Sequence, residues 1–128
     1  MIKDFLVINC IGDIKDSIAL KFNNKFILKK IQKKINNNEQ LVNNILIFLK
    51  KNKVNIDSKF SIIVNQGPGS FSSLRVSISV AIGIKISKKA KLFGYKNAQI
   101  KELTLENIEF LINKNMLENK LIKPIYLS

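Results

Sequence analysis

The sequence predicts an α/β fold in which a mixed sheet of about five strands is flanked by helices. Three observations support this prediction. Short runs of β-branched apolar residues alternate with longer segments that read as helices. Gly, Pro and Asn separate these segments. The composition, with 46% apolar and 24% charged residues among 128, is typical of one globular domain.

The first half of the chain predicts three strands and one helix. Gly12-Asp13 marks the first turn, and Asn23-Asn24 marks a hairpin turn because asparagine tolerates the left-handed conformation. Asn37 is a suitable N-cap residue with Gln40 three positions later. The expected elements are the strands Phe5–Cys10, Ser17–Phe22 and Phe26–Lys30 and the helix Asn37–Lys51.

The second half begins with a strand and a glycine-rich turn. In Gly67-Pro68-Gly69, glycine permits positive φ and proline fixes φ near −65°, so the chain reverses sharply. Ser70 can then cap a following helix. Such a turn either packs closely against another segment or binds an anion, and it lacks the lysine of a P-loop. The expected elements are the strands Phe60–Asn65 and Lys91–Tyr95, the helices Ser70–Ser87 and Ala98–Asn113, and a tail Leu121–Ser128 that either pairs or stays free.

The segment Leu74–Ile86 carries conflicting signals. Apolar residues alternate strictly with small or polar ones, and this periodicity by itself predicts a strand. The prediction of a helix here rests on a family resemblance.

The string Gly67–Val76, followed by Ala81-Ile82-Gly83, resembles the signature G-P-G-S-F-T-G-L-R-I…A-K-G-L of the TsaB family. This family is similar to the superfamily of sugar kinases, Hsp70 and actin. Two departures are Ser73, where the family usually has glycine, and Ile84-Lys85 after Gly83.

Weaker similarities lie outside the signature. Phe5–Cys10 resembles the start of the opening hairpin, with Asn9 in place of the usual aspartate. Lys91–Tyr95 resembles the strand after the signature, and Pro124–Leu127 resembles the C-terminal ending. The resemblance therefore implies a ribonuclease H-like lobe over residues 1–128, a single TsaB-like N-terminal lobe with the second lobe largely absent.

A helix over Ser70–Ser87 is apolar on two sides, and we expect a lobe of this size to bury only one of them. The other side, together with the helix Asn37–Lys51, then forms a partner surface. The residues expected at this interface are Leu41, Ile45, Phe48, Leu74, Ile78, Val80 and Ile82.

Missing residue types argue against catalysis. The chain has no histidine and one cysteine, Cys10, so a Ser-His-Asp triad, a Cys-His pair and an ordinary zinc site are excluded. Asn9 is neutral and cannot hold Mg²⁺ by charge. Four acidic residues fall in predicted turns or at helix ends, where solvation or capping is expected, namely Asp13, Asp16, Asp57 and Glu39. We therefore expect no catalytic residue, no metal site and no cofactor.

The resemblance implies a non-catalytic subunit in the threonylcarbamoyladenosine modification of tRNA, which docks and supports a TsaD-type catalytic subunit. ATP would be used by the complex, a TsaE-type ATPase would be a further partner, and tRNA would be contacted indirectly. A homodimer through the same helices is a further arrangement.

The charge suggests an alternative, a small basic RNA-binding module that contacts tRNA phosphates. The net charge is +13, yet lysines are spread along the chain and accompany the abundant Asn and Ile that AT-rich codons supply. A solvated surface is the preferred interpretation of these lysines. Arg75 is the only arginine, and it alone could pair bidentately with a carboxylate or phosphate.

The expected location is the cytoplasm. No apolar run approaches the ~20 residues needed to span a bilayer. The single cysteine lies in a predicted buried strand, which suits a reducing compartment.

Overall fold

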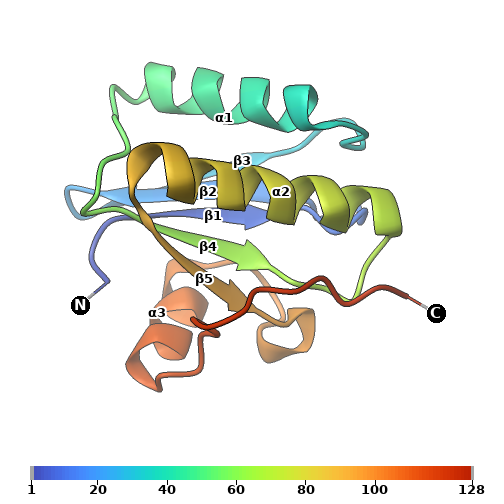
Figure 1. The fold of residues 1–128 in the computed structure, drawn as a ribbon. Helices are drawn as coiled ribbons and strands as arrows, with labels where there is room; N and C mark the ends of the chain where they lie inside the picture. The colour runs from blue at the N-terminus through green and yellow to red at the C-terminus, as the bar shows by residue number, and fades with distance from the viewer. Residues whose placement is uncertain (1, 128) are drawn as a thin grey trace.

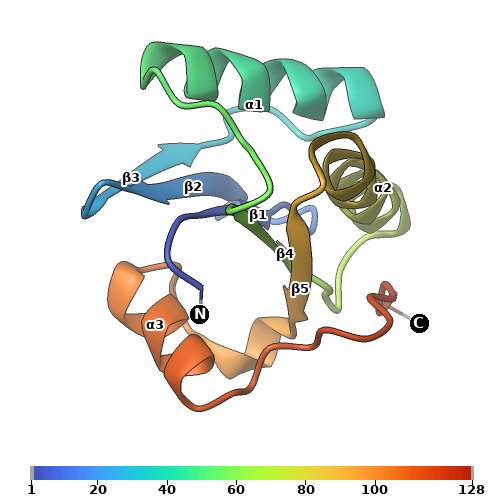
Figure 2. The same ribbon diagram turned by 60° about the vertical axis from the view of Figure 1, so that its left-hand side comes forward.

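The computed structural model, which describes residues 2–127, is built on a five-stranded sheet with strand order β3-β2-β1-β4-β5. Helices α1 and α2 cover one face and α3 covers the other (Figures 1 and 2). This confirms the predicted α/β class. The elements are β1 (Phe5–Asn9), β2 (Ser17–Phe22), β3 (Lys25–Lys30), α1 (Asn38–Lys51), β4 (Ser61–Asn65), α2 (Phe71–Lys88), β5 (Lys91–Tyr95), the 3-10 turn η1 (Asn97–Gln99) and α3 (Leu105–Asn113).

The sheet is mixed, as expected. Strand β1 pairs antiparallel with β2 and parallel with β4, which in turn pairs parallel with β5. Asn23 and Asn24 turn the β2–β3 hairpin with φ of 48° and 63°, so the predicted left-handed asparagines are confirmed. In the parallel part of the sheet, the carboxyl ends of β1, β4 and β5 meet at one edge.

Successive side chains of the central strands point to opposite faces of the sheet, and this divides the hydrophobic core into two clusters. Leu6 and Ile8 face α1 and α2, whereas Phe5 and Val7 face α3. All four side chains are buried. Because both faces of the sheet are covered, β1 and β4 are continuous apolar runs, as expected for strands buried on both sides.

The segment that alternates like a strand is the helix α2, so the resemblance predicted it correctly and the periodicity did not. Ser70 caps it, its hydroxyl accepting from the Ser73 N–H at 3.3 Å. Helix α2 packs against α1 on one side and against the sheet on another. Because α2 is covered on two sides, it needs apolar residues on both, and this removes the usual 3.6-residue pattern; Arg75, Ser79 and Gly83 lie on its exposed side.

The expectation that the lobe could bury only one side of α2 is therefore wrong. Val76 and Val80 are 5% exposed, and Ile78 is 6% exposed. Six of the seven residues expected to face a partner belong to the core, because α1, α2 and the glycine turn enclose them. They are Leu41, Ile45, Phe48, Leu74, Ile78 and Val80, and only Ile82 is exposed.

The predicted helix Ala98–Asn113 is also wrong in its first half. Asn97–Gln99 forms a 3-10 turn, and the backbone is extended at Ile100. Thr104 caps α3 instead, its hydroxyl accepting from the Asn107 N–H at 3.1 Å. A threonine that can satisfy a free N–H starts the helix there and leaves the preceding residues outside it. No helix within residues 2–127 is long and apolar enough to traverse a lipid bilayer.

Candidate functional site

The glycine turn between β4 and α2 requires both of its glycines. Gly67 has φ of +102°, which favours glycine. At Gly69, an added Cβ would lie 2.5 Å from the carbonyl oxygen of Ile11, in the loop after β1. The Ser70 N–H donates to the same oxygen at 2.9 Å. Pro68 is exposed at the tip. The turn thus packs backbone against backbone.

The C-terminal segment covers the other side of this turn. The Gly69 N–H donates to the Ile125 carbonyl at 3.2 Å, and the Leu127 N–H donates back to the Gly69 carbonyl at 3.1 Å. The Tyr126 ring lies 4.9 Å from the Phe71 ring. Of the two alternatives for the tail, pairing is confirmed through residue 127. The turn lies between two segments, as expected for a packing element.

Arg75 lies on the first turns of α2 and is exposed. Phe71, four positions earlier, is 60% exposed although its ring stacks on Tyr126. These two signature residues therefore lie at the surface near the start of α2, whereas Gly67 and Gly69 are buried.

A cluster of polar side chains connects the carboxyl ends of β1, β4 and β5. The Asn65 side-chain amide donates to the side-chain oxygens of Asn9 at 2.7 Å and Asn97 at 3.1 Å. The Tyr95 hydroxyl donates to the same Asn9 oxygen at 3.3 Å, and the Asn9 amide donates to the Ser17 hydroxyl at 3.4 Å. Sequence analysis singled out only Asn9. The usable signal is that Asn9, Asn65 and Tyr95 each end a parallel strand.

Asp16 organises the loop that follows β1. Its carboxylate accepts from the N–H groups of Ile11, Gly12 and Asp13 at 3.0, 2.9 and 3.1 Å. Burial raises the pKa of Asp16 above its ordinary value, and the hydrogen bonds from the backbone act in the opposite direction. Of the two roles expected for Asp16, capping is confirmed by these hydrogen bonds. Solvation is not, because Asp16 is only 4% exposed.

A cavity of about 460 Å³ opens beside this cluster. Asn9, Ser17 and Asn97 line its inner part, and Lys30 and Lys101 lie toward β3 and the segment after η1. Besides these amides, hydroxyls and lysines, the carboxylates of Asp13, Asp16 and Glu102 also line the cavity, so its lining carries both signs of charge. Among the described residues, no group of three or more His, Cys, Asp or Glu side chains could hold a metal ion.

A larger hollow, a groove of about 910 Å³, lies between α1 and α2. Ile45, Leu49 and Val80 contribute to its apolar lining. Val42 and Leu46 also line it and are 36% and 57% exposed. We call this hollow, with these residues and Gly83, the α1–α2 groove.

Gly83 keeps the groove open in the middle of α2. Apart from the adjacent residues and the backbone of α2 itself, no heavy atom lies within 4 Å of the position that its Cβ would occupy. Three lysines line the end of the groove where both helices terminate, namely Lys50, Lys53 and Lys88. The groove therefore has an apolar centre and one basic end. Of the seven residues expected at an interface, Ile45 and Val80 line it, and Ile82 is exposed on α2 outside the lining.

Known structures share this architecture. The chain superposes on YeaZ from Pseudomonas aeruginosa with a TM-score of 0.64 and 18% sequence identity over 74% of its length. The fold is that of YeaZ. A second structure, of an uncharacterized protein with similarity to peptidase YeaZ from Pseudomonas aeruginosa, matches with a TM-score of 0.60 and 18% identity over the same share. No protein-family model and no curated protein sequence matches the chain.

YeaZ is a TsaB protein, so the fold agrees with the resemblance carried by Gly67–Val76. The chain spans 44% of the length of each of the two YeaZ-like structures.

Proposed function

We propose that this chain is a non-catalytic subunit in the threonylcarbamoyladenosine modification of tRNA, and that it docks a TsaD-type catalytic subunit on the α1–α2 groove. The observation that carries the proposal is an open, apolar groove on a lobe with the YeaZ fold. The TsaB-like signature at the start of α2 supports the same assignment. The surface differs from the one first expected, because the buried residues of α1 and α2 are replaced by Val42, Leu46 and Gly83.

The groove suits a helix of the partner. Its apolar centre would be covered on docking, and a Leu side chain that passes from exposed to buried contributes about 1.5–3 kcal/mol. Gly83 lets a partner backbone or side chain approach α2 closely. The lysines at the end of the groove predict acidic residues on the matching part of the partner, because charge complementarity orients the encounter.

Catalysis would belong to the partner. The strand-end cluster presents the neutral amide of Asn9, where the family usually has an aspartate, so charge-assisted binding of Mg²⁺ is not supported here. On this proposal ATP is used by the complex, and a TsaE-type ATPase joins it. The location would be the cytoplasm, where the thiol of Cys10 stays reduced.

Co-purification with the TsaD-type protein of the same organism tests this proposal. Gly83→Trp fills the groove from a helix position with open space around it, and Leu46→Asp places a charge on an exposed apolar position. Each should weaken binding by about 30-fold or more, which corresponds to about 2 kcal/mol. Ile14→Asp, at a position 87% exposed and outside the groove lining, is the matched control.

The variants must keep the circular dichroism spectrum and melting temperature of the parent chain. If Gly83→Trp and Leu46→Asp bind the partner as well as Ile14→Asp does, the groove is not the docking surface. If light scattering shows that the chain alone is a dimer, and that both groove variants make it monomeric, a second copy occupies the groove instead.

A further inference from the structure

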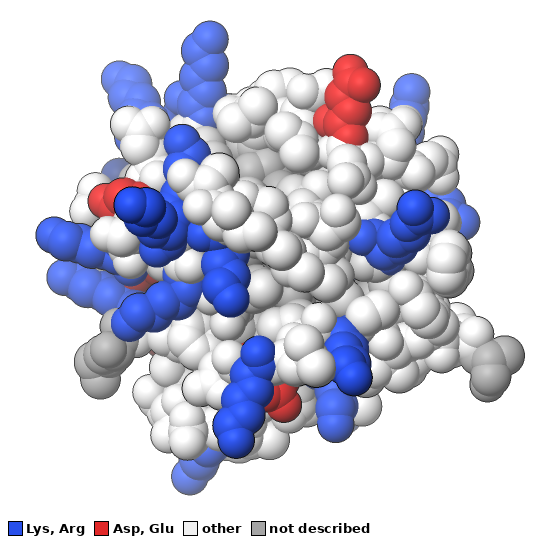
Figure 3. Space-filling view, viewed as in Figure 1, with Lys and Arg blue, Asp and Glu red and all other residues white. Residues whose placement is uncertain are grey.

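Lysines gather at one end of the molecule, where β1, β4 and β5 begin and α1 and α2 terminate. The strand register aligns them, because Phe5 lies opposite Lys21 and Ser61, and Ser61 lies opposite Lys91. Figure 3 shows this concentration on the left-hand side of the view. We call this surface the basic end, formed by Lys3, Lys21, Lys25, Lys50, Lys51, Lys53, Lys59, Lys85, Lys88, Lys89 and Lys91.

Acidic residues are unevenly distributed too. Among the described residues, Asp4 and Asp57 are those that lie beside the basic end. Others belong to α3 and its flanking segments, on the face of the sheet that α1 and α2 do not cover (Figure 2). These are Glu102, Glu106, Glu109 and Glu118. The eleven lysines and two carboxylates give the basic end a local charge of +9 out of the net +13.

Two of the lysines hold a backbone conformation that favours glycine. Lys53, just after α1, and Lys89, just after α2, both have φ of +56°. Glycine is common at this position after a helix, and a side chain there costs about 1 kcal/mol. Asn115 has the same φ of +56° after α3, at an uncharged residue. The chain therefore keeps a positively charged residue just after α1 and just after α2, at some cost in stability.

We propose that the basic end binds the phosphate backbone of base-paired RNA. Its strand ends come from all five strands, and at about 4.8 Å per strand they span roughly 19 Å, which is wide enough for several phosphates. Helix ends and strand ends form it, so no helix projects to enter a deep groove. The wide, shallow minor groove of A-form RNA suits such a flat surface.

Base-paired RNA is favoured over single strands because single-stranded sites use exposed aromatic rings as stacking platforms. The exposed aromatic side chains of Phe71 and Tyr126 lie at the start of α2, at the other end of this helix from the basic end, and Phe110 lies on α3. This inference does not depend on the proposed function. The two surfaces share Lys50, Lys53 and Lys88, so RNA binding is measured on the chain alone and docking by co-purification with the partner.

The test measures binding of the full chain to an unmodified tRNA transcript by fluorescence anisotropy at several salt concentrations. Counterion release predicts that affinity falls steeply with salt, with a log–log slope of about −3 to −5 for four to five phosphate contacts. Lys53→Gly combined with Lys89→Gly should weaken binding about tenfold and reduce the slope by about two. These substitutions suit the positive φ, so the fold is retained or stabilised.

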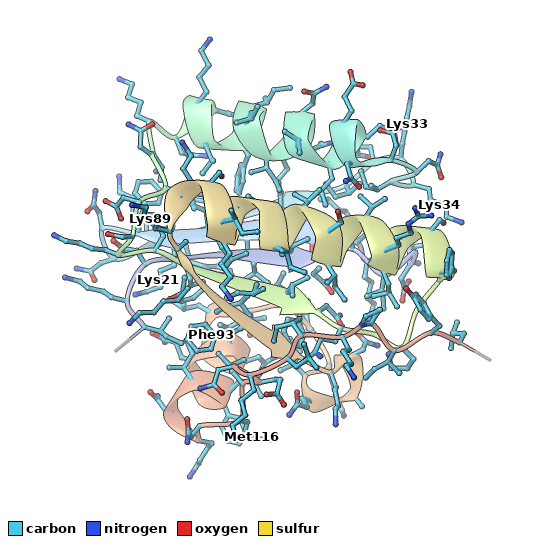
Figure 4. All side chains as sticks on the ribbon, viewed as in Figure 1. Lys21, Lys33, Lys34, Lys89, Phe93 and Met116 are labelled. Atoms are coloured by element: carbon cyan, nitrogen blue, oxygen red, sulfur yellow. The ribbon has the colours of Figure 1, made fainter. Side chains whose placement is uncertain are left out.

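The matched control removes the same charge elsewhere. Lys33 and Lys34 lie at the other end of the molecule from Lys21 and Lys89 (Figure 4). Lys33→Gln combined with Lys34→Gln should leave tRNA affinity within about twofold. Asn115→Gly controls for the change in backbone preference and should not alter affinity. An equal loss in the Lys33 and Lys34 variant, or no binding by the parent chain, would overturn the proposal.

Three further probes separate the sources of negative charge. They are a DNA duplex of equal length, vesicles of phosphatidylserine with phosphatidylcholine, and poly-glutamate. The proposal holds if tRNA binds most tightly and the Lys53 and Lys89 variant weakens that binding. It is overturned in favour of DNA, a membrane surface or an acidic protein if the corresponding probe binds as tightly or more tightly with the same dependence on these lysines.

Discussion

The side-chain amide of Asn65 donates to the side-chain oxygen of Asn9 across 2.7 Å and thereby joins the ends of β4 and β1. The same Asn65 accepts the Gly67 N–H at 2.9 Å, so the strand-end cluster and the glycine turn share one residue. Asn65 is fully buried. A polar residue without exposure is retained only when its hydrogen bonds are made, and here they hold the turn against the sheet.

Asn65→Ala should destabilise the fold by about 2–4 kcal/mol, because the Gly67 N–H and the Asn9 oxygen both lose a partner inside the protein. Urea unfolding followed by circular dichroism measures the change. Asn97→Ala, which removes one hydrogen bond at an exposed residue, should cost about 1 kcal/mol or less. Equal costs for the two variants would contradict the importance assigned to the turn.

Substitution by alanine should have opposite effects on stability at Gly69 and at Gly83. Gly69→Ala should destabilise by about 2 kcal/mol or more, because its Cβ would clash with the Ile11 backbone. Gly83→Ala should stabilise by about 0.5–1 kcal/mol, since it lies within α2 with no atom near the new methyl group. Thermal unfolding of both variants checks the pair, and destabilisation by Gly83→Ala would contradict an open groove.

Tyr126→Ala should loosen the C-terminal segment while leaving the sheet intact. It removes a ring pair worth about 0.5–1.5 kcal/mol, and the lower end is expected because both rings are largely exposed. Hydrogen exchange should become faster at the N–H groups of Leu127 and Gly69 and stay unchanged in β1. Phe110→Ala, which removes an exposed ring on α3, should leave both N–H groups protected.

Alkaline pH should destabilise the protein through Cys10. Burial raises the pKa of its thiol, so the folded state keeps the proton after the unfolded chain has released it. The stability that this group contributes is therefore complete below the unfolded pKa of about 8.5 and falls by about 1.4 kcal/mol per pH unit above it. Between pH 8.5 and 10, Cys10→Ala should show a shallower fall in unfolding free energy than the parent chain.

The native protein should also resist thiol reagents. Cys10 is 0% exposed, and the thiolate is the reactive form. Labelling by a disulfide reagent at pH 8 should occur only through unfolding, with a rate that rises in urea. Rapid labelling of the folded chain would contradict the burial of this residue.

Local chemistry in the sequence determined most of the elements. Asparagines at Asn23 and Asn24, the cap at Ser70 and the glycine at Gly67 each satisfy a requirement that neighbouring residues set, and the structure confirms these features. The missing histidine excluded whole classes of active site before any fold was known. The identity of α2 as a helix came from resemblance, because its alternation of apolar residues is compatible with a strand.

Tertiary structure alone decided what each apolar residue faces. The sequence shows that Leu41 and Ile78 are apolar residues within helical segments. Their burial depends on the packing of α1 and α2 on each other and on the sheet. The strand-end cluster likewise joins Asn9 to Asn65, which are far apart in the chain, through parallel pairing. The basic end forms in the same way, since lysines at separate positions meet only where strands begin and helices terminate. Contacts of this kind depend on strand order and layer packing, which no local pattern encodes.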